Sequence, residues 1–562
     1  MFRGVLLLLR RHSLLIIWLM VITYVFSSSY VRHLTDPKYF YLREMLGISL
    51  LLSRASASVI NISCFMVIIP VCRSFITYIR VFGSKISAKC VLNWIDASKK
   101  FHIICAFTIL FAGYFHTIAH VVNAFNFSSH YNKNFRDINA ANFQGEDPLN
   151  LITGSVPGIT GILMVIILFI LTAAAVRPMR NISYDLFLIT HHLFIIFLIL
   201  LLIHPMSGIL KEQVNVNTHI PGCKMNKSSR ENQRFLSVDT TCTEMPVFVS
   251  YNSWIWLWIM SSLFVYTIDV TYRFIRRNEH ANLLSFHLYK CDVISLKFLK
   301  PDFRANPGQY VFLQCPRIST FEWHPFSISQ CPSSTDPTFT VHLRTTGDWT
   351  ECLKEYLIED NEEMLISTDA HEIRMSYLPS EQPSGKILVD GPYSSCFENV
   401  FQHSVSICIA GGIGLTPFAS VLSYLRIDME NLTKIKRIHL LWIGREIEIF
   451  YCFAELLTEM FETVWQLNQP DKFEFLLYVT KIEICDTVLN TLQESFPVLK
   501  PRIQLGRPKW HHLFEQWSSI YKKSNIGIFC CGSKVLTDEI KTLSHCYNSR
   551  GCRFSYYHEE FS

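Results

Sequence analysis

Charged residues are scarce in this chain, whereas long apolar runs are common. Charged residues make up 17% of the 562 residues, against about 25% in typical soluble proteins. Hydrophobic residues make up 50%, and nearly all of the long apolar runs lie in residues 1–275. The remainder has the composition of a soluble protein. The sequence therefore predicts a membrane domain followed by soluble domains, because the chain is too long for one core.

Several patterns that mark other functions are also missing. The 18 cysteines have no metal-ligand spacing, and no EF-hand pattern occurs, which argues against direct calcium control. The net charge of +5 is not gathered in one soluble patch, so we expect no nucleic-acid binding. The first apolar run is about 20 residues long and lacks a small-residue cleavage site, which favours an uncleaved membrane span.

Six runs are long and apolar enough to cross a bilayer, which takes about 20 residues. They cover residues 12–31, 44–71, 101–125, 156–176, 184–205 and 253–272. Basic clusters flank these runs at residues 1–11, 73–100, 177–180 and 273–277, all on one side if every run crosses. By the positive-inside rule this side is cytosolic, and the soluble half lies there too.

The other three loops, residues 32–43, 126–155 and 206–252, then face away from the cytosol. Asn126 and Asn226 begin glycosylation sequons in these loops, although Asn126 sits close to the membrane. Cys223 and Cys242 share the third loop. An oxidising compartment permits a disulfide between them, and two free thiols remain the alternative.

Histidines in the third and fifth spans mark a functional site, since they are costly in a bilayer. The third span has His102, His116 and His120, and the fifth has His191, His192 and His204. His102 and His116 lie about 21 Å apart along a helix, and His191 and His204 about 20 Å. Matching depths therefore pair His102 with His191 near the cytosolic face. They pair His116 with His204 near the opposite face.

Two stacked six-coordinate haems need this arrangement, with one imidazole on each side of each iron. His120 and His192 are then neighbours of the ligands. The step from His191 to His204 misses the same helical face by about 140°. The fifth span would need a tightened turn, or ligation from another side.

Arg54 lies in the middle of the second span and needs an anion or a polar cavity there. A haem propionate would supply the anion. The small residues around it, Ser53 and residues 55–58, would let a flat macrocycle approach the backbone, and they equally suit close helix packing.

The soluble half changes pattern twice. From about Asn282, short β-branched and aromatic runs predict an antiparallel β-barrel, and alternating strands and helices then predict a doubly wound parallel sheet. We expect domains at residues 1–280, 281–393 and 394–562. A buried strand runs into the turn GGIGLTP at residues 411–417. Such a turn lets backbone N–H groups approach a pyrophosphate at a helix N-terminus.

Several motifs in this order resemble those of the NADPH oxidase family. They are HPFSIS (324–329), HLRTTGDWT (342–350), VDGPY (389–393), AGGIGLTPF (410–418), GRPKW (506–510) and FCCG (529–532). The histidine pairs resemble the family's ferric-reductase-type membrane domain. LSRASAS (52–58), NTHIPGC (217–223) and the ending EEFS are most similar to the isoform-four branch, which makes mainly hydrogen peroxide.

The resemblance implies a six-span helical bundle fused to a ferredoxin-reductase-like module with FAD, NADPH and two b-type haems. The haem ligands would be His102, His116, His191 and His204. The residues implied for FAD are Trp323, His324, Pro325, Phe326 and Ser327 at the flavin, and Arg344, Gly347 and Thr350 at its pyrophosphate. A surface salt bridge is the alternative for Arg344.

Those implied for NADPH are Gly411, Gly412, Gly414, Thr416 and Pro417 at the pyrophosphate, Arg445 and Arg507 at the 2′-phosphate, and Cys531 and Gly532 at the nicotinamide. Phe561 would stack on the flavin until nicotinamide displaces it. The chain departs from the family at Ser394, where glycine is usual, and at Ser533, where proline is usual.

The implied activity carries electrons from NADPH through FAD and both haems to dioxygen outside the cytosol, giving superoxide and hydrogen peroxide. His219 would donate protons, a role that suits a group titrating near neutral pH. The resemblance implies residence in the plasma membrane or endoplasmic reticulum and, as a partner, the small membrane subunit of phagocyte flavocytochrome b. A ferric or cupric metalloreductase, and a non-catalytic scaffold or proton channel, are the alternatives.

Overall fold

The computed structural model divides into two compact units, Met1–Arg73 with Gly83–Val270, and Ser74–Phe82 with Thr271–Ser562. The structure describes residues 13–85, 95, 97–225, 241–242, 244–277, 281–359, 366–369, 372–376, 387–428, 434–481, 486–522, 524–548 and 552–559. The segment 74–82 joins the second unit, although the sequence analysis placed everything before residue 281 in the membrane domain. The three domain limits stay a prediction.

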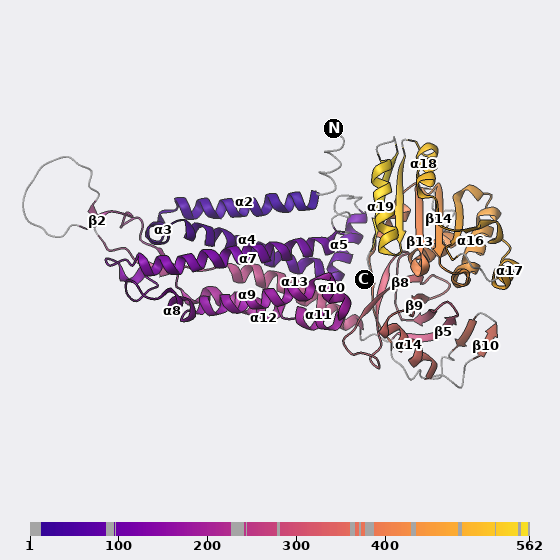
Figure 1. Ribbon diagram of the computed structural model, residues 1–562, viewed down its shortest axis with the longest axis horizontal. Helices are drawn as coiled ribbons and strands as arrows, with labels where there is room; N and C mark the ends of the chain where they lie inside the picture. The colour runs from indigo at the N-terminus through magenta and orange to yellow at the C-terminus, as the bar shows by residue number, and fades with distance from the viewer. Residues whose placement is uncertain are drawn as a thin grey trace, which may run out of the picture. The chain divides into compact units, whose positions relative to one another are not determined.

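The first unit contains long apolar helices that run alongside one another (Figure 1). Its helices are α2 (Ser13–Thr35), α3 (Phe40–Leu46), α4 (Ile48–Ile68), α7 (Ser98–Ser129), α8 (Pro148–Thr153), α9 (Val156–Ala175), α10 (Arg177–Ile182), α11 (Tyr184–His191) and α12 (Phe194–Ile203). The helix α13 (Ile255–Arg277) begins in this unit, and α5 (Arg73–Lys85) mostly belongs to the second. The described residues contain six spans of membrane length, which confirms the predicted number.

The second and third spans pack closely because their contact face is built from small and polar side chains. Ser53, Ala55 and Ser56 of α4 are at most 1% exposed. The side chain of Asn123 on α7 donates to Ser53, and Ser49 donates to Asn123. Small residues let two helix backbones approach, and the hydrogen bonds join them. The small residues around Arg54 therefore serve helix packing at these three positions.

The outer loops carry short strands and a disulfide. The strands are β1 (Lys211–Gln213) with β4 (Phe248–Ser250), and β2 (Lys224–Met225) with β3 (Thr241–Cys242). Cys223 is disulfide-bonded, which excludes two free thiols. The Asn126 side chain donates hydrogen bonds to the Leu46 carbonyl and the Ser49 hydroxyl. Asn226 lies outside the described residues.

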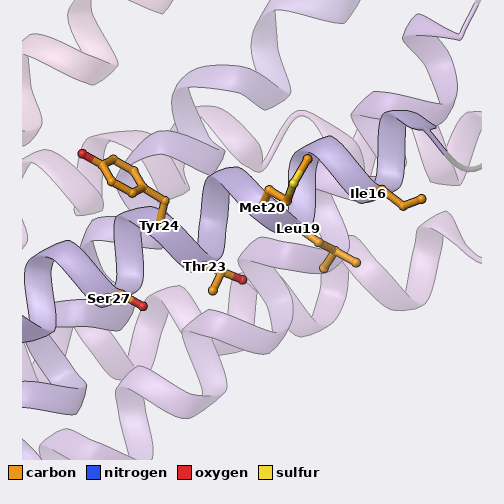
Figure 2. Close-up of a pocket in the computed structure, with 6 residues that line it drawn as sticks. All are labelled: Ile16, Leu19, Met20, Thr23, Tyr24 and Ser27. Atoms are coloured by element: carbon orange, nitrogen blue, oxygen red, sulfur yellow. The ribbon is translucent and has the colours of Figure 1, made fainter. Parts of the chain in front are cut away.

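A shallow groove runs along α2 and is lined by Ile16, Leu19, Met20, Thr23, Tyr24 and Ser27 (Figure 2). All six residues come from one helix, and Tyr24 is 74% exposed. The groove contains no titratable cluster beyond the Tyr24 phenol. We therefore interpret it as membrane-facing helix surface rather than as a catalytic site.

In the second unit, an antiparallel sheet of eight strands has the order β10-β11-β5-β6-β9-β8-β7-β12. The strands are β5 (Asn282–Tyr289), β6 (Val293–Leu299), β7 (Tyr310–Gln314), β8 (His324–Gln330), β9 (Thr338–Arg344), β10 (Ile366–Asp369), β11 (Glu372–Ser376) and β12 (Leu388–Tyr393), with α14 at Asp348–Glu359. Phe286, Phe298, Val311 and Phe339 are fully buried between them. This sheet matches the predicted antiparallel barrel domain.

A parallel sheet of six strands follows, in the order β16-β15-β14-β13-β17-β18. Its strands are β13 (Val405–Gly411), β14 (Arg437–Gly444), β15 (Phe473–Val479), β16 (Ile503–Leu505), β17 (Asn525–Cys531) and β18 (Arg553–His558). The helices α15 (Thr416–Asp428), α16 (Ala454–Gln466), α17 (Asp486–Ser495), α18 (Trp510–Ile520) and α19 (Lys534–Tyr547) connect them. The strand order reverses between β13 and β17, and in such folds ligands bind outside the carboxyl ends of the strands at that point.

Candidate functional site

The structure brings four membrane histidines together as two pairs. The ring centre of His102 lies 6.2 Å from that of His191, and the ring centre of His116 lies 6.2 Å from that of His204. A metal held between two imidazoles separates the facing nitrogens by about 4 Å, since each bond is about 2 Å. Ring centres at this separation leave room for one metal atom between each pair.

Hydrogen bonds at Nδ1 orient three of these rings. Nδ1 of His102 bonds the Val67 carbonyl at 2.8 Å, and Nδ1 of His116 bonds the Ser53 carbonyl at 3.0 Å. Nδ1 of His204 lies 2.9 Å from the Thr160 hydroxyl. A partner at one ring nitrogen fixes the other as the metal ligand. The arrangement therefore presents Nε2 of these rings toward the interior of each pair.

The fifth span is interrupted between His191 and His204, the two residues that an ideal helix would place on different faces. Helix α11 ends at His191 and α12 begins at Phe194. The bonds across this break are of the tighter, three-residue type: His192 N–H to Ile189 O, Leu193 N–H to Thr190 O, and Ile195 N–H to His192 O. A 3₁₀-type turn changes the advance per residue. The structure thus has the tightened turn that sequence reasoning left as one of two options.

The two remaining histidines lie beside the pairs. The ring centre of His120 is 4.5 Å from that of His116, so His120 packs on the back of a paired ring. His192 is exposed, and its Nδ1 bonds the Leu188 carbonyl at 2.6 Å. Nδ1 of His191 is buried without a hydrogen-bond partner among the described residues.

The guanidinium group of Arg54 packs on an aromatic ring rather than against a described acidic side chain. Its guanidinium carbon lies 4.2 Å from the ring centre of Tyr251, and its Nε lies 3.5 Å from Nε2 of His33. A desolvated cation gains about 2 kcal/mol over an aromatic face. The predicted propionate partner of Arg54 stays a prediction, and Tyr251 is a contact that sequence reasoning missed.

His219 is fully buried in the third outer loop and contacts Tyr41 at the start of α3. Its Nε2 lies 2.6 Å from the Tyr41 hydroxyl, and its Nδ1 lies 2.9 Å from the Glu244 carbonyl. Because a carbonyl can only accept, Nδ1 carries a proton, and in the neutral ring Nε2 accepts from Tyr41. Burial raises the pKa of Tyr41. The alternative of a solvated loop residue is therefore wrong.

The predicted flavin segment lies on β8 beside α14. The ring of His324 packs on Trp349 with centres 4.5 Å apart, and Phe326 stacks on the same indole at 6.0 Å. Pro325 is paired with Phe312 of β7. Trp323 lies just before the strand, with the Arg277 guanidinium 4.2 Å from its ring centre.

Arg344 ends β9 and is exposed, four residues before α14 begins. The described acidic side chains form no ion pair with it, so the surface salt bridge is not seen. The Gly347 N–H donates to the Thr350 hydroxyl at 3.1 Å, which orders the turn before the helix. A cation and a helix start at one place suit a phosphate.

The glycine turn after β13 lies against the end of β17. A side chain at Gly414 would collide with the Cys531 carbonyl oxygen, and one at Gly411 would meet Gly532 at 3.4 Å. Gly412 has a φ of 58°, a conformation that favours glycine. Thr416 and Pro417 follow in the first turn of α15. The two turns therefore meet at the switch point of the parallel sheet.

Cys531 is a neutral thiol at this junction, because burial and the nearby Glu559 raise its pKa to about 12. Arg445 and Arg507 are exposed at the same edge of the sheet, after β14 and β16. The Gly506 N–H donates to the Val479 carbonyl at 2.8 Å. This bond holds the turn that carries Arg507 beside β15. Phe561 lies outside the described residues.

The two departures from the family leave local structure intact. Ser533 is the N-cap residue of α19, although its hydroxyl makes no cap hydrogen bond. The Ser394 N–H donates to the Thr77 hydroxyl in the segment 74–82 at 3.3 Å. Each serine thus occupies an ordered backbone position.

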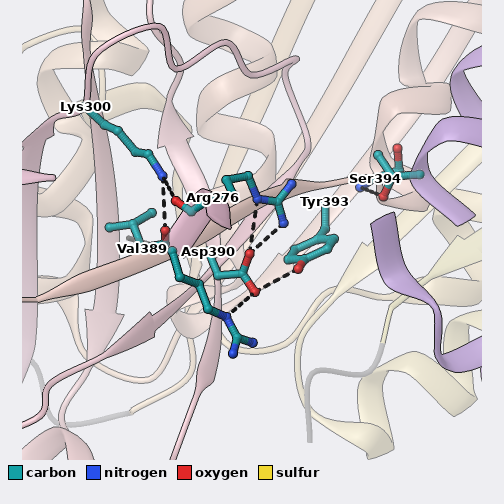
Figure 3. A network of polar contacts seen from close by, with 8 residues as sticks. Arg276, Lys300, Val389, Asp390, Tyr393 and Ser394 are labelled. Carbon is teal, nitrogen blue, oxygen red and sulfur yellow. Dashed lines mark hydrogen bonds and ion pairs between the residues drawn. The ribbon is translucent and has the colours of Figure 1, made fainter. Parts of the chain in front are cut away.

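Sequence reasoning missed the role of Asp390 in the VDGPY motif. Its carboxylate is fully buried and accepts from Arg276 at 2.6 Å, Arg277 at 3.0 Å and the Tyr393 hydroxyl at 2.9 Å (Figure 3). Lys300 donates to the Arg276 and Val389 carbonyls. Burial alone would raise the pKa of Asp390, but the two guanidinium groups and the phenol outweigh burial and lower it.

Three family models match successive parts of the chain. Residues 65–202 match the model of the ferric reductase like transmembrane component, residues 278–396 match that of an FAD-binding domain, and residues 403–545 match that of the ferric reductase NAD binding domain. A solved ferredoxin NADP⁺ reductase from Neisseria gonorrhoeae is 13% identical over 50% of this chain and 98% of its own, with a TM-score of 0.32.

Named relatives match over nearly the full length. NADPH oxidase 4 of Mus musculus and that of Homo sapiens are each 36% identical over 98% of this chain and 98% of their own. NADPH oxidase 3 of Rattus norvegicus is 29% identical over 97% of both chains. With its six membrane helices and its FAD and NADPH domains, the chain belongs to the NADPH oxidase family, is similar to isoform four, and is an integral membrane oxidoreductase with a cytosolic dehydrogenase.

Proposed function

We propose that this NADPH oxidase delivers electrons from NADPH to dioxygen on the extracytosolic side of the membrane and yields superoxide and hydrogen peroxide. The proposal depends mainly on two pairs of membrane histidines, His102 with His191 and His116 with His204. In each pair the ring centres lie 6.2 Å apart. Both pairs come from the third and fifth spans, at two depths. An electron path across a bilayer needs carriers at more than one depth, and these helices supply two.

The residues of each pair fit a haem. His102 with His191, and His116 with His204, would hold one b-type haem each, and the bonds at Nδ1 of His102, His116 and His204 would leave Nε2 of these three rings for the iron. When bound, FAD supplies the conversion of a hydride into single electrons, and haem iron supplies one-electron transfer. The chain's own contribution is to supply the four imidazoles and to orient three of them, since a hydrogen bond at Nδ1 sets ring orientation and ligand basicity.

On the cytosolic side, the residues of the second unit bind and orient the nucleotides. Arg344 and the start of α14 would hold the FAD pyrophosphate, and the turn Gly411–Gly414 would hold that of NADPH. Arg445 and Arg507 would select NADPH over NADH through the 2′-phosphate. The neutral Cys531 thiol would line the nicotinamide site without adding charge.

His219 and Tyr41 would supply protons on the outer side. Two superoxide ions and two protons give hydrogen peroxide and dioxygen, so peroxide output depends on a proton donor near the site of release. The His219 ring holds a proton at Nδ1 and contacts a phenol at Nε2. Its buried hydrogen bonds would keep the ring in place, with the Tyr41 hydroxyl as a second proton-bearing group beside it; solvent would resupply the two protons that each peroxide consumes.

One experiment tests the acceptor. Membranes given NADPH are assayed in parallel for peroxide with Amplex Red and for ferric reduction with ferrozine. We expect oxygen-dependent peroxide output, lost in His116→Ala membranes together with part of the dithionite-reduced b-type α-band. Oxygen-independent iron reduction without peroxide would support the metalloreductase instead. A missing b-type spectrum in the unsubstituted protein would exclude electron transfer and favour a scaffold or channel.

The small membrane subunit of phagocyte flavocytochrome b is the proposed partner. The apolar outer faces of the spans support a membrane partner in general, since α2 carries exposed Leu19, Met20 and Tyr24. Co-expression with the tagged subunit tests the proposal. We expect the chain to co-purify in mild detergent, whereas an unrelated single-span protein should not retain it.

A further inference from the structure

Two thiols from distant parts of the second unit face each other. Cys291 lies in the turn between β5 and β6 of the antiparallel domain, and Cys452 lies in the 3₁₀ segment Ile447–Phe453 that follows β14 of the parallel domain. Their Sγ atoms are 3.6 Å apart across 161 positions of sequence. Neither cysteine is in a disulfide. A small shift brings sulfur atoms at this distance to the bonding separation of about 2 Å.

The thiols lie where the two domains pack on each other. Tyr289 and Cys291 pack against the core that contains Cys452 and Phe453. Next to them, the half-buried His342 ring of β9 lies 4.5 Å from the ring of Phe453. A covalent bond here would therefore join one domain to the other.

Both predicted cofactor sites adjoin this contact. Val293, two residues after Cys291, is paired with Arg344, the predicted FAD pyrophosphate residue. Arg445, predicted to hold the 2′-phosphate, precedes the segment that carries Cys452. A link between the two cysteines would hold the segments at both sites in one fixed relation.

The surroundings of Cys291 favour oxidation. It is half-buried, so a small oxidant can reach it, whereas Cys452 is 7% exposed. The contact with Cys452 and the charge of Arg344 lower the pKa of Cys291 although burial opposes this. Reactive cysteines have such partly exposed, electropositive sites. Burial instead raises the pKa of both Cys331 and Cys531 to about 12, which leaves these thiols inert.

We propose that Cys291 and Cys452 form a reversible modification site, at which hydrogen peroxide joins them in a disulfide that slows NADPH oxidation. The inference goes beyond the proposed function and rests on it only for the source of the peroxide. The disulfide would make the enzyme subject to feedback inhibition by its own product, hydrogen peroxide.

The chemistry balances in two steps. The Cys291 thiolate attacks one oxygen of hydrogen peroxide, the O–O bond breaks, and sulfenic acid forms as water leaves. The Cys452 sulfur then attacks the Cys291 sulfur, and a second water leaves. Two thiols lose two electrons and two protons, and one peroxide is reduced to two waters. A cytosolic dithiol reductant reverses the change by thiol–disulfide exchange.

The disulfide would act by restricting motion. Hydride transfer requires the nicotinamide to reach the flavin, and the two rings belong to different domains of this unit. A bond between Cys291 and Cys452 fixes the segments that bear Arg344 and Arg445. We expect turnover to fall while bound FAD is retained, because no predicted flavin contact is broken.

The test uses the reduced, full-length protein with FAD, treated with added hydrogen peroxide in the absence of NADPH. Non-reducing peptide mapping should find a Cys291–Cys452 cross-link. NADPH-dependent reduction of ferricyanide should fall severalfold and recover with dithiothreitol. Cys291→Ser and Cys452→Ser should each abolish the cross-link and the inhibition. Cys546→Ser, which changes an exposed thiol on α19, should behave like the unsubstituted protein.

Three outcomes would overturn the proposal. Peroxide could leave both thiols reduced, it could oxidise them separately without a cross-link, or the cross-link could form with turnover unchanged. Because the peroxide is added, these results do not depend on what the chain itself releases. An enzyme that makes no peroxide would thus fail the proposed function and could still form the disulfide.

Discussion

The hydroxyl of Tyr41 lies 2.6 Å from Nε2 of His219, and both side chains are buried. They come from α3 and the third outer loop, 178 positions apart. The Glu244 carbonyl accepts from Nδ1, and the other ring nitrogen faces the Tyr41 hydroxyl. Under the proposed function, this buried pair would influence whether superoxide or hydrogen peroxide is released.

The first prediction therefore concerns Tyr41→Phe. The substitution removes the hydroxyl and keeps the ring, so we expect released superoxide to rise relative to peroxide while NADPH consumption is maintained. His219→Ala should have the larger effect, because it removes the proposed proton donor itself. Superoxide-specific and peroxide-specific probes in the same membranes measure the ratio. An unchanged ratio in both variants would remove the pair from product formation.

Thr160 provides a second test, through the hydrogen bond between its hydroxyl and Nδ1 of His204. Loss of an outer-shell partner typically costs 10–100-fold in metal affinity or activity, so we expect about that loss of haem retention in Thr160→Val. Haem content and the reduction potential of the outer centre are measured after purification. Thr172→Val is the matched control on the same helix, since its hydroxyl donates to the Leu168 carbonyl of that helix and contacts no histidine among the described residues. Equal losses in both variants would indicate general helix damage.

The third prediction addresses nucleotide choice. A hydrogen bond to a charged group contributes about 1.5–3 kcal/mol, which corresponds to about 10–100-fold in affinity. Arg445→Ala and Arg507→Ala should each raise the KM for NADPH by about this factor. The kcat/KM for NADH should stay nearly constant, because NADH lacks the 2′-phosphate. A parallel loss with both nucleotides would contradict the assigned role.

Asp390 provides the fourth prediction. Asp390→Asn leaves Arg276 and Arg277 without their buried anion, and breaking a buried pair costs about 3–5 kcal/mol. We expect a lower Tm, followed by the release of flavin fluorescence. Asp336→Asn is the control, since the pair of Asp336 with Lys297 is more than a third exposed on both sides and should matter little.

The ion pairs of Asp390 with Arg276 and Arg277 also predict that stability depends on pH. Because the pKa of Asp390 is lowered in the folded protein, the pair adds stability above the unfolded pKa of about 4. This stability is lost as the pH falls through the lowered pKa, since the unfolded chain then binds the proton more readily. Thermal melts from pH 7 to pH 3 should show a steeper acid loss in the unsubstituted protein than in Asp390→Asn. Parallel curves would show that other groups control the acid transition.

The sequence predicted much of the site because the relevant patterns are local. Hydrophobic run length gives the six spans, since the bilayer sets how many residues a helix needs. The rise per residue pairs His102 with His191 and His116 with His204 by depth. The glycine turn is recognisable because only glycine fits beside the Cys531 carbonyl, although the sequence shows the glycines and not the contact.

Contacts between distant residues were beyond such reasoning. Nothing local to Asp390 indicates that the end of α13 supplies its two cations, and nothing near Cys291 indicates Cys452. The sequence by itself determined the spans, their orientation, the domain types and the depth of the paired histidines, because periodicity, length and charge act along the chain. Only the tertiary structure decided the break after His191, the burial of His219 on Tyr41 and the meeting of the two thiols, because packing joins residues that no spacing relates.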